Sequence, residues 1–138
     1  MQKYDLPGNL LHLEIIERAY VNDTDNITHI LNALREDGFF IEMDDFGTGE
    51  SSLSMVAEMP VDLLKLDRSF LVSGMNNKRQ LEIIRFIITL VQSLNIEILA
   101  EGVETQEQAD ILTSMGCRYA QGYFYHRPAP TAAFLEIP

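Results

Sequence analysis

Two adjacent carboxylates, Asp44 and Asp45, directly follow the largely apolar run 39–43, and a loop with two glycines, 46–49, comes next. A strand that ends in two acids and then turns sharply can present several oxygen atoms to one hard divalent cation. A solvated turn has the same pattern. On these residues alone, a metal site and a turn remain competing interpretations.

Strand-like and helix-like segments alternate along the rest of the chain, joined by short connections. The expected strands cover 10–16, 39–44, 62–66, 96–100 and 119–124, and the expected helices cover 24–37, 51–58, 78–94 and 105–115. Such alternation predicts a parallel sheet with right-handed crossovers. Both an open doubly wound sheet and a piece of a (β/α) barrel fit this order.

Polar side chains favour the barrel. On each expected strand they occupy the face opposite an apolar one, at or near the carboxyl end. They include Glu14, Glu42, Asp44, Lys65, Glu101 and Gln121. A barrel builds its site at this end with apolar faces turned toward the helices, whereas a sheet covered on both faces is more uniformly apolar. The sequence therefore predicts an α/β fold, a partial TIM-barrel-like (β/α) barrel of roughly five strands and four helices.

Composition narrows the function classes. Ten basic and 21 acidic residues give a formal net charge of −11, which argues against direct contact with DNA or with an anionic membrane. The single cysteine, Cys117, cannot form an internal disulfide, in keeping with a reducing, cytoplasmic location. The longest apolar stretch near the middle, 86–91, is too short to cross a bilayer. A membrane anchor elsewhere in a longer parent protein stays compatible with this composition.

Five motifs in a fixed order resemble the EAL domain family, the bacterial cyclic di-GMP phosphodiesterases. These segments are 13–17 (LEIIE), 44–53 (DDFGTGESSL), 62–70 (DLLKLDRSF), 100–105 (AEGVET) and 121–128 (QGYFYHRP). The resemblance implies that residues 1–138 are the C-terminal portion of a single EAL domain of the TIM-barrel type.

The sequence also departs from the family pattern. Ile16 replaces a usual threonine, Glu50 replaces a usual tyrosine, and Glu42 is an acid where a small residue is usual. The Glu-Ala-Leu tripeptide that names the family is absent, as is the segment with its metal-binding asparagine. We therefore expect a fragment or the product of a truncated gene, inactive on its own.

Site roles follow from the resemblance. It implies Mg²⁺ or Mn²⁺ as cofactor, with Glu14, Asp44 and Asp45 as metal ligands. It implies a catalytic group in which Glu101 is the general base or a further ligand, Lys65 holds a positive charge, and Asp67 supports the two. The implied supporting residues are Glu17, which would fix the loop 47–49, Gln121, which would orient Glu101, and Glu104.

Each role has a structural alternative. Lys65 and Glu101 form a buried ion pair inside the barrel in one interpretation. In the alternative for Glu104, its negative charge stabilises the start of the helix that follows. In the alternative for Glu17, it is a solvated residue at the end of a strand. We expect His12 to fill the barrel interior rather than to bind a ligand.

Three functions stay open at this point. The leading hypothesis is hydrolysis of cyclic di-GMP to linear pGpG in bacterial second-messenger signalling, in a parent protein with sensor or cyclase domains. The alternative is a catalytically inactive cyclic di-GMP-binding or protein-interaction module. A third hypothesis, an unrelated barrel enzyme acting on a sugar phosphate, lacks a glycine-rich phosphate loop near the last strand. Because five strands leave two sheet edges, we also expect a homo-oligomer, with Leu11, Leu13 and Phe124 exposed at the edges.

Overall fold

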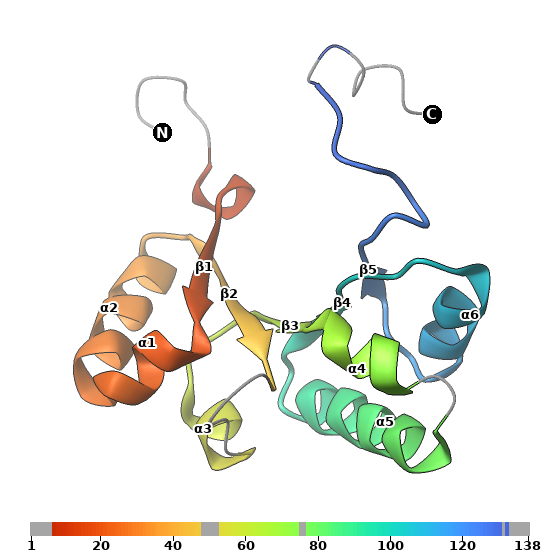
Figure 1. Ribbon diagram of the computed structural model, residues 1–138. Coiled ribbons are helices and arrows are strands. Elements are labelled where there is room, and N and C mark those ends of the chain that lie inside the picture. The colour runs from red at the N-terminus through yellow and green to blue at the C-terminus, as the bar shows by residue number, and fades with distance from the viewer. Residues whose placement is uncertain (1–6, 48–52, 75–76, 131, 133–138) are drawn as a thin grey trace.

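The computed structural model describes residues 7–47, 53–74, 77–130 and 132. Five parallel strands form one sheet in the order β1-β2-β3-β4-β5 (Figure 1). The strands are β1 (His12–Ile16), β2 (Phe40–Phe46), β3 (Leu63–Leu66), β4 (Glu97–Ala100) and β5 (Tyr119–Ala120). The helices are α1 (Glu17–Asn22), α2 (Thr24–Glu36), α3 (Leu53–Glu58), α4 (Arg68–Gly74), α5 (Lys78–Ser93) and α6 (Gln106–Ser114), after a short 3-10 helix, η2 (Gly8–Leu10).

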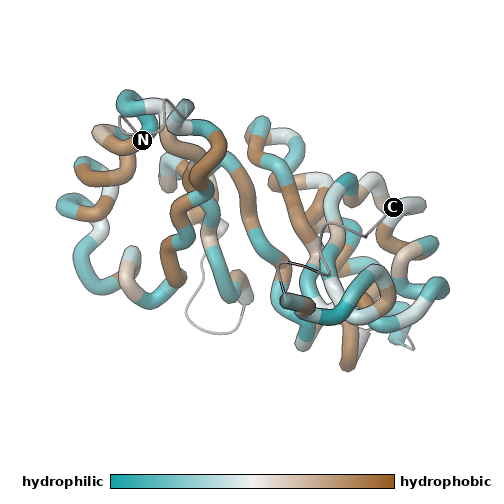
Figure 2. Tube along the Cα trace, turned by 90° about the horizontal axis from the view of Figure 1, so that it is seen from above, coloured by the Kyte–Doolittle hydropathy of each residue, from teal (hydrophilic) through white to brown (hydrophobic). Residues whose placement is uncertain are grey.

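The sequential strand order explains the layering. Right-handed crossovers between neighbouring parallel strands place all connecting helices on one face of the sheet. On that outer face, Ile41, Met43, Leu64, Leu66 and Ile98 are at most 1% exposed. Figure 2 shows mostly apolar strands in the centre and helices that alternate between apolar and polar residues around them. This is a partial (β/α) barrel, and the predicted fold class is confirmed.

Asp62 links the amino ends of β2 and β3 to the carboxyl end of α2. The Asp62 carboxylate accepts a hydrogen bond from the Ile41 amide at 2.9 Å through Oδ2. Its Oδ1 accepts from the Arg35 guanidinium at 2.8 Å. These two hydrogen bonds tie the end of α2 to the starts of β2 and β3.

Most element boundaries agree with the sequence-based expectation, but two helices were missed. Neither α1 nor α4 was expected. Each is shorter than two full helical turns, which is too short for a clear periodic pattern in the sequence. Tertiary burial stabilises them instead: Tyr20 on α1 is 2% exposed and Leu71 on α4 is 1% exposed. The last strand was expected to reach 124, yet β5 ends at Ala120. Residues 51–52 of the expected helix 51–58 lie outside the described residues.

The exposed edge of the sheet differs in part from the expectation. Leu11 is 48% exposed, as expected. The prediction that Leu13 and Phe124 are exposed at the edges is wrong, because both side chains are partly buried against the core. Ile16, at the end of β1, is 53% exposed and takes their place. Among the described residues, no helix has the length and apolar character needed to cross a membrane.

Candidate functional site

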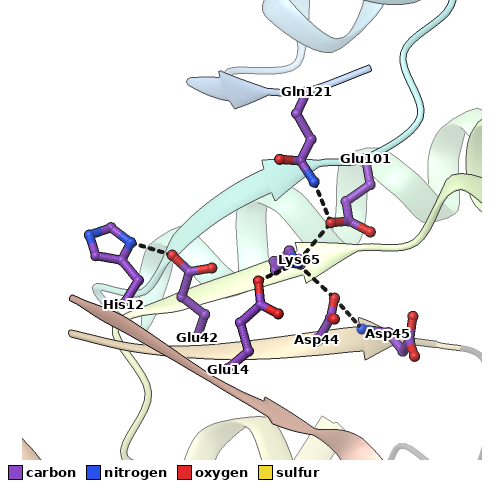
Figure 3. A network of polar contacts seen from close by, with 8 residues as sticks. All are labelled: His12, Glu14, Glu42, Asp44, Asp45, Lys65, Glu101 and Gln121. Atoms are coloured by element: carbon purple, nitrogen blue, oxygen red, sulfur yellow. Dashed lines mark hydrogen bonds and ion pairs between the residues drawn. The ribbon is translucent and has the colours of Figure 1, made fainter. Parts of the chain in front are cut away.

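The Lys65 ammonium lies at the centre of three carboxylates on the inner face of the sheet, the face opposite the helices (Figure 3). Its Nζ is 2.8 Å from Glu14 Oε1, 3.0 Å from Asp44 Oδ1 and 2.9 Å from Glu101 Oε1. The acids come from β1, from β2 and from the residue after β4, whereas Lys65 is on β3. Alternation along each strand turns all four side chains to this face, so the predicted grouping at the carboxyl ends is observed.

Lys65 remains positively charged at neutral pH. Burial lowers the pKa of its ammonium, but the hydrogen bonds to Glu14, Glu101 and Asp44 and the nearby charge of Glu101 outweigh this effect. The net result is a pKa well above the ordinary value of a lysine. Lys65 is therefore suited to hold a fixed charge and not to accept a proton.

Glu101 is oriented by two donors that share one oxygen. Gln121 Nε2 donates to Glu101 Oε1 at 2.6 Å, and Lys65 Nζ approaches the same atom. Within the described part of the chain, no donor contacts Oε2. This oxygen is thus free to accept a proton from a group brought into the site.

Asp44 and Asp45 occupy an irregular strand end. The register between β2 and β3 shifts between Met43 and Phe46, and Asp45 has a φ of 59°. The Asp45 amide donates to Asp44 Oδ1 at 3.0 Å. A non-glycine residue with positive φ stores backbone strain, and such positions concentrate at functional sites. The Asp45 side chain is exposed and, in Figure 3, lies beyond Asp44 toward the end of the strand.

Glu17 is the first residue of α1 and is 5% exposed, so the alternative of a solvated strand end was wrong. Its Oε2 accepts a hydrogen bond from the Gly47 amide at 3.3 Å. Gly47 has a φ of +90°, and a Cβ there would lie 2.4 Å from the Phe70 ring. The contact expected between Glu17 and the loop is therefore present at Gly47, whereas Thr48 and Gly49 lie outside the described residues.

Asp67 immediately precedes α4 and is not one of the three carboxylates that contact Lys65. Its Oδ1 accepts a hydrogen bond from the Ser69 amide at 2.9 Å, the contact of a helix N-cap. Partial burial raises the pKa of Asp67, but hydrogen bonds from Ser69 and from the Arg68 amide, with the Arg68 charge, lower it further than burial raises it. Asp67 thus has the structural role of a helix cap, and its predicted support of Lys65 and Glu101 stays a prediction.

Glu104 precedes α6, where its amide donates to Gln108 Oε1 at 2.7 Å. Thr105 and Gln108 complete a capping box at this helix start. The Glu104 side chain lines a pocket beside Glu101, so both its helix-start location and its place near the site are observed.

This pocket of about 670 Å³ adds residues that sequence reasoning did not single out. Arg68, Tyr123 and Arg127 line it together with Asp67, Glu101, Glu104 and Gln121. The Arg127 guanidinium lies 4.2 Å from the centre of the Tyr123 ring. Such a pair offers an aromatic face and a positive charge to one ligand. Arg68 lies in the motif 62–70, and Tyr123 and Arg127 lie in the motif 121–128, so membership of these motifs could have pointed to them.

The donor chemistry of the cluster fits a hard divalent cation, because Glu14, Asp44, Asp45 and Glu101 supply only oxygen atoms. Among the described residues, however, no three acidic, histidine or cysteine side chains are already spaced to share one metal ion. Glu14, Asp44 and Glu101 are arranged around the Lys65 ammonium, a cation of the protein itself. A metal ion would have to bind beside Lys65.

Comparisons with known proteins agree with this geometry. The EAL domain family model matches residues 1–128. The cyclic di-GMP phosphodiesterase NbdA of Pseudomonas aeruginosa is 40% identical over 137 residues, which are 99% of this chain and 18% of NbdA. The structure of the PaMucR phosphodiesterase in complex with c-di-GMP superposes with a TM-score of 0.89 at 37% identity, covering 96% of this chain and 54% of that one.

A manganese/cy-diGMP complex of Klebsiella pneumoniae BlrP1 is also similar, with a TM-score of 0.86 at 30% identity over 93% of this chain and 33% of BlrP1. The chain thus spans about half of the PaMucR structure and less than a fifth of NbdA. From the family match over residues 1–128, together with the carboxylate cluster at the strand ends, we conclude that the chain belongs to the EAL domain family.

Proposed function

We propose that the domain to which this chain belongs hydrolyses cyclic di-GMP to linear pGpG in the bacterial cytoplasm. The observation that supports this most strongly is the meeting of Glu14, Asp44 and Glu101 on the Lys65 ammonium. The complexes of PaMucR and BlrP1 with the cyclic dinucleotide add support from similar structures.

Mg²⁺ or Mn²⁺ is the cofactor we assign, with Glu14, Asp44 and Asp45 as its ligands. When bound, the cation would neutralise phosphodiester oxygens and make a water molecule more acidic. Adjacent residues of a regular strand point to opposite faces, whereas the register shift and the positive φ of Asp45 interrupt this alternation at the end of β2, which suits both acids to bind cations there.

The chain's own residues supply proton transfer and charge. Glu101 Oε2 accepts a proton from the attacking water as the water oxygen bonds to phosphorus. The bond from phosphorus to the ribose 3′-oxygen breaks, that oxygen takes a proton from solvent water to become a hydroxyl, and Glu101 returns its proton to solvent. Lys65 stabilises the negative charge on the phosphoryl oxygens, since it keeps its own proton. Gln121 holds Glu101 in place through Oε1.

The pocket beside Glu101 is the proposed site for a guanine base and its phosphate. Tyr123 provides a ring for stacking, and Arg68 and Arg127 provide positive charge in a chain that is acidic overall. The 138 residues alone should bind the dinucleotide without appreciable turnover, because their sequence lacks the Glu-Ala-Leu segment.

The test is calorimetric binding of cyclic di-GMP and cyclic di-AMP with Mn²⁺ present, with chromatography of the products. We expect preference for cyclic di-GMP and a loss of about tenfold in affinity in Arg127→Ala, since a charge-assisted contact disappears. Arg79→Ala, at an exposed arginine on α5, is the matched control and should bind like wild type. Equal affinity for the two dinucleotides, or equal binding by both variants, would contradict the proposal.

A further inference from the structure

Glu14 and Glu42 are directly opposite each other in the register of β1 and β2. Neighbouring strands are about 5 Å apart, so the two acids stand side by side on the inner face. Like charges in this arrangement destabilise a sheet. The two carboxylates nevertheless bind different partners (Figure 3): Glu14 accepts from Lys65, whereas Glu42 is hydrogen-bonded to His12 Nδ1.

His12 is well placed to hold Glu42. Its ring stacks on Phe40, with ring centres 4.4 Å apart and an angle of 27° between the planes. Because a carboxylate only accepts hydrogen bonds, Nδ1 of His12 is the donor in this pair. The sequence-based expectation that His12 fills the barrel interior was wrong in one respect, since its side chain is 49% exposed.

Glu42 needs a partner more than Glu14 and Asp44 do, because its side chain is the least exposed of these three acids on the inner face. The residue is 7% exposed, and a buried carboxylate without a hydrogen bond or a cation is costly. Lys65 already contacts three acids, and its contacts do not include Glu42. His12 and Lys65 therefore divide the inner-face carboxylates of β1 and β2 between them.

We propose that His12 is a positioning residue that keeps the Glu42 carboxylate out of the divalent cation site. This inference rests on the proposed function, in which Glu14 and Asp44 bind the cation. While His12 holds Glu42, the cation can bind Glu14, Asp44 and Asp45, and Glu42 does not become a further ligand. Removing His12 leaves Glu42 to turn toward Glu14 and Asp44, where a cation is the available partner. Affinity for hard cations rises with the number of charged oxygen ligands.

The test measures Mn²⁺ affinity by calorimetry in the purified chain, so that no catalytic turnover is needed. We expect His12→Ala to bind roughly tenfold more tightly than wild type, through the added carboxylate. His12→Asn should restore the wild-type affinity, because its amide can donate to Glu42 from a similar position. Adding Glu42→Gln to His12→Ala should abolish the gain. His29→Ala, at an exposed histidine on α2, is the matched control and should leave the affinity unchanged.

Thermal unfolding followed by circular dichroism verifies that each variant is folded. If folded His12→Ala fails to bind more tightly than wild type, or if the gain persists without Glu42, the inference is wrong. Absence of binding in every variant would also overturn it. Asp44→Asn in the same series separates the two proposals: a loss there with no gain in His12→Ala contradicts only the role of His12.

Discussion

Asp44 and Asp45 are neighbours in sequence, yet the backbone turns between them, so that Asp44 Oδ1 lies 3.0 Å from Lys65 Nζ while Asp45 lies further toward the end of β2. The turn depends on the positive φ of Asp45 and on the register shift beside it. Adjacent residues on a regular strand would point to opposite faces. The irregularity is what allows both acids to serve one end of the barrel.

The backbone conformation of Asp45 predicts which substitutions the fold accepts. Asn tolerates a positive φ, so Asp45→Asn should change the free energy of unfolding by less than about 0.5 kcal/mol. Asp45→Val should destabilise by about 2 kcal/mol, because a β-branched residue is strained in this region. Urea denaturation of both variants measures the difference. Similar losses in the two would show that the positive φ is not the constraint.

Asp67 gives a pH-dependent prediction for the start of α4. Asp67→Ala should cost about 1 kcal/mol at neutral pH through loss of the N-cap, whereas Asp67→Asn should cost little, since Asn caps equally well. The pKa of Asp67 is lower in the folded state than its ordinary value of 3.8. Its ionised form therefore contributes stability above that ordinary value, and this contribution is lost as the pH falls through the lower folded-state pKa.

Unfolding of wild type and both variants between pH 7 and about pH 2 measures this effect. The advantage of wild type over Asp67→Ala should shrink on acidification, while Asp67→Asn keeps its cap at every pH. A wild-type advantage that grew as the pH fell would contradict the role of the ionised carboxylate.

The tight packing at Gly122 predicts that a side chain at this position would disturb the loop after β5, which carries Gln121. A Cβ at Gly122 would lie 2.1 Å from the Val103 carbonyl oxygen and 2.3 Å from its amide nitrogen. Both are backbone atoms that cannot rotate away, so Gly122→Ala should destabilise by about 2 kcal/mol or more and displace Gln121. Gly38→Ala is the control, since Gly38 also has a positive φ but nothing lies within 4 Å of the added atom. Equal losses in the two would assign the effect to backbone strain alone.

The open edges of the sheet predict self-association. β1 and β5 are the outer strands of the described sheet, and Leu11 and Ile16 expose apolar surface on β1 and beside it. An unpaired edge with apolar side chains favours pairing with a second chain. Sedimentation velocity over a wide concentration range should show association that Ile16→Lys weakens. A folded monomer at high concentration would rule this out.

The residues on the inner face could be placed from sequence because strand alternation is a local property. Glu14 and Lys65 each lie between two apolar residues, and Asp44 follows the apolar Met43, which indicates the face to which each side chain turns. The distances among them depend on strand register, which the sequence does not state. The family resemblance supplied the roles, and the structure supplied the common contact with Lys65.

The parts that could not be predicted depend on tertiary contacts. The helices α1 and α4 have few residues for a periodic signal and are stabilised by buried Tyr20 and Leu71. The pairing of Tyr123 with Arg127 depends on the path of the chain after β5, where no regular element constrains the backbone. The contact between His12 and Glu42 joins residues 30 positions apart and required the register of two strands.

The most direct test of the carboxylate cluster as a cation site is a calorimetric titration of Mn²⁺ into wild type and Asp44→Asn, with Glu82→Gln on the exposed face of α5 as control. Asp44→Asn keeps the side-chain shape and removes one charged oxygen ligand next to Lys65. We predict that its affinity falls at least about tenfold, while Glu82→Gln binds like wild type. Equal affinity in wild type and Asp44→Asn would contradict the account.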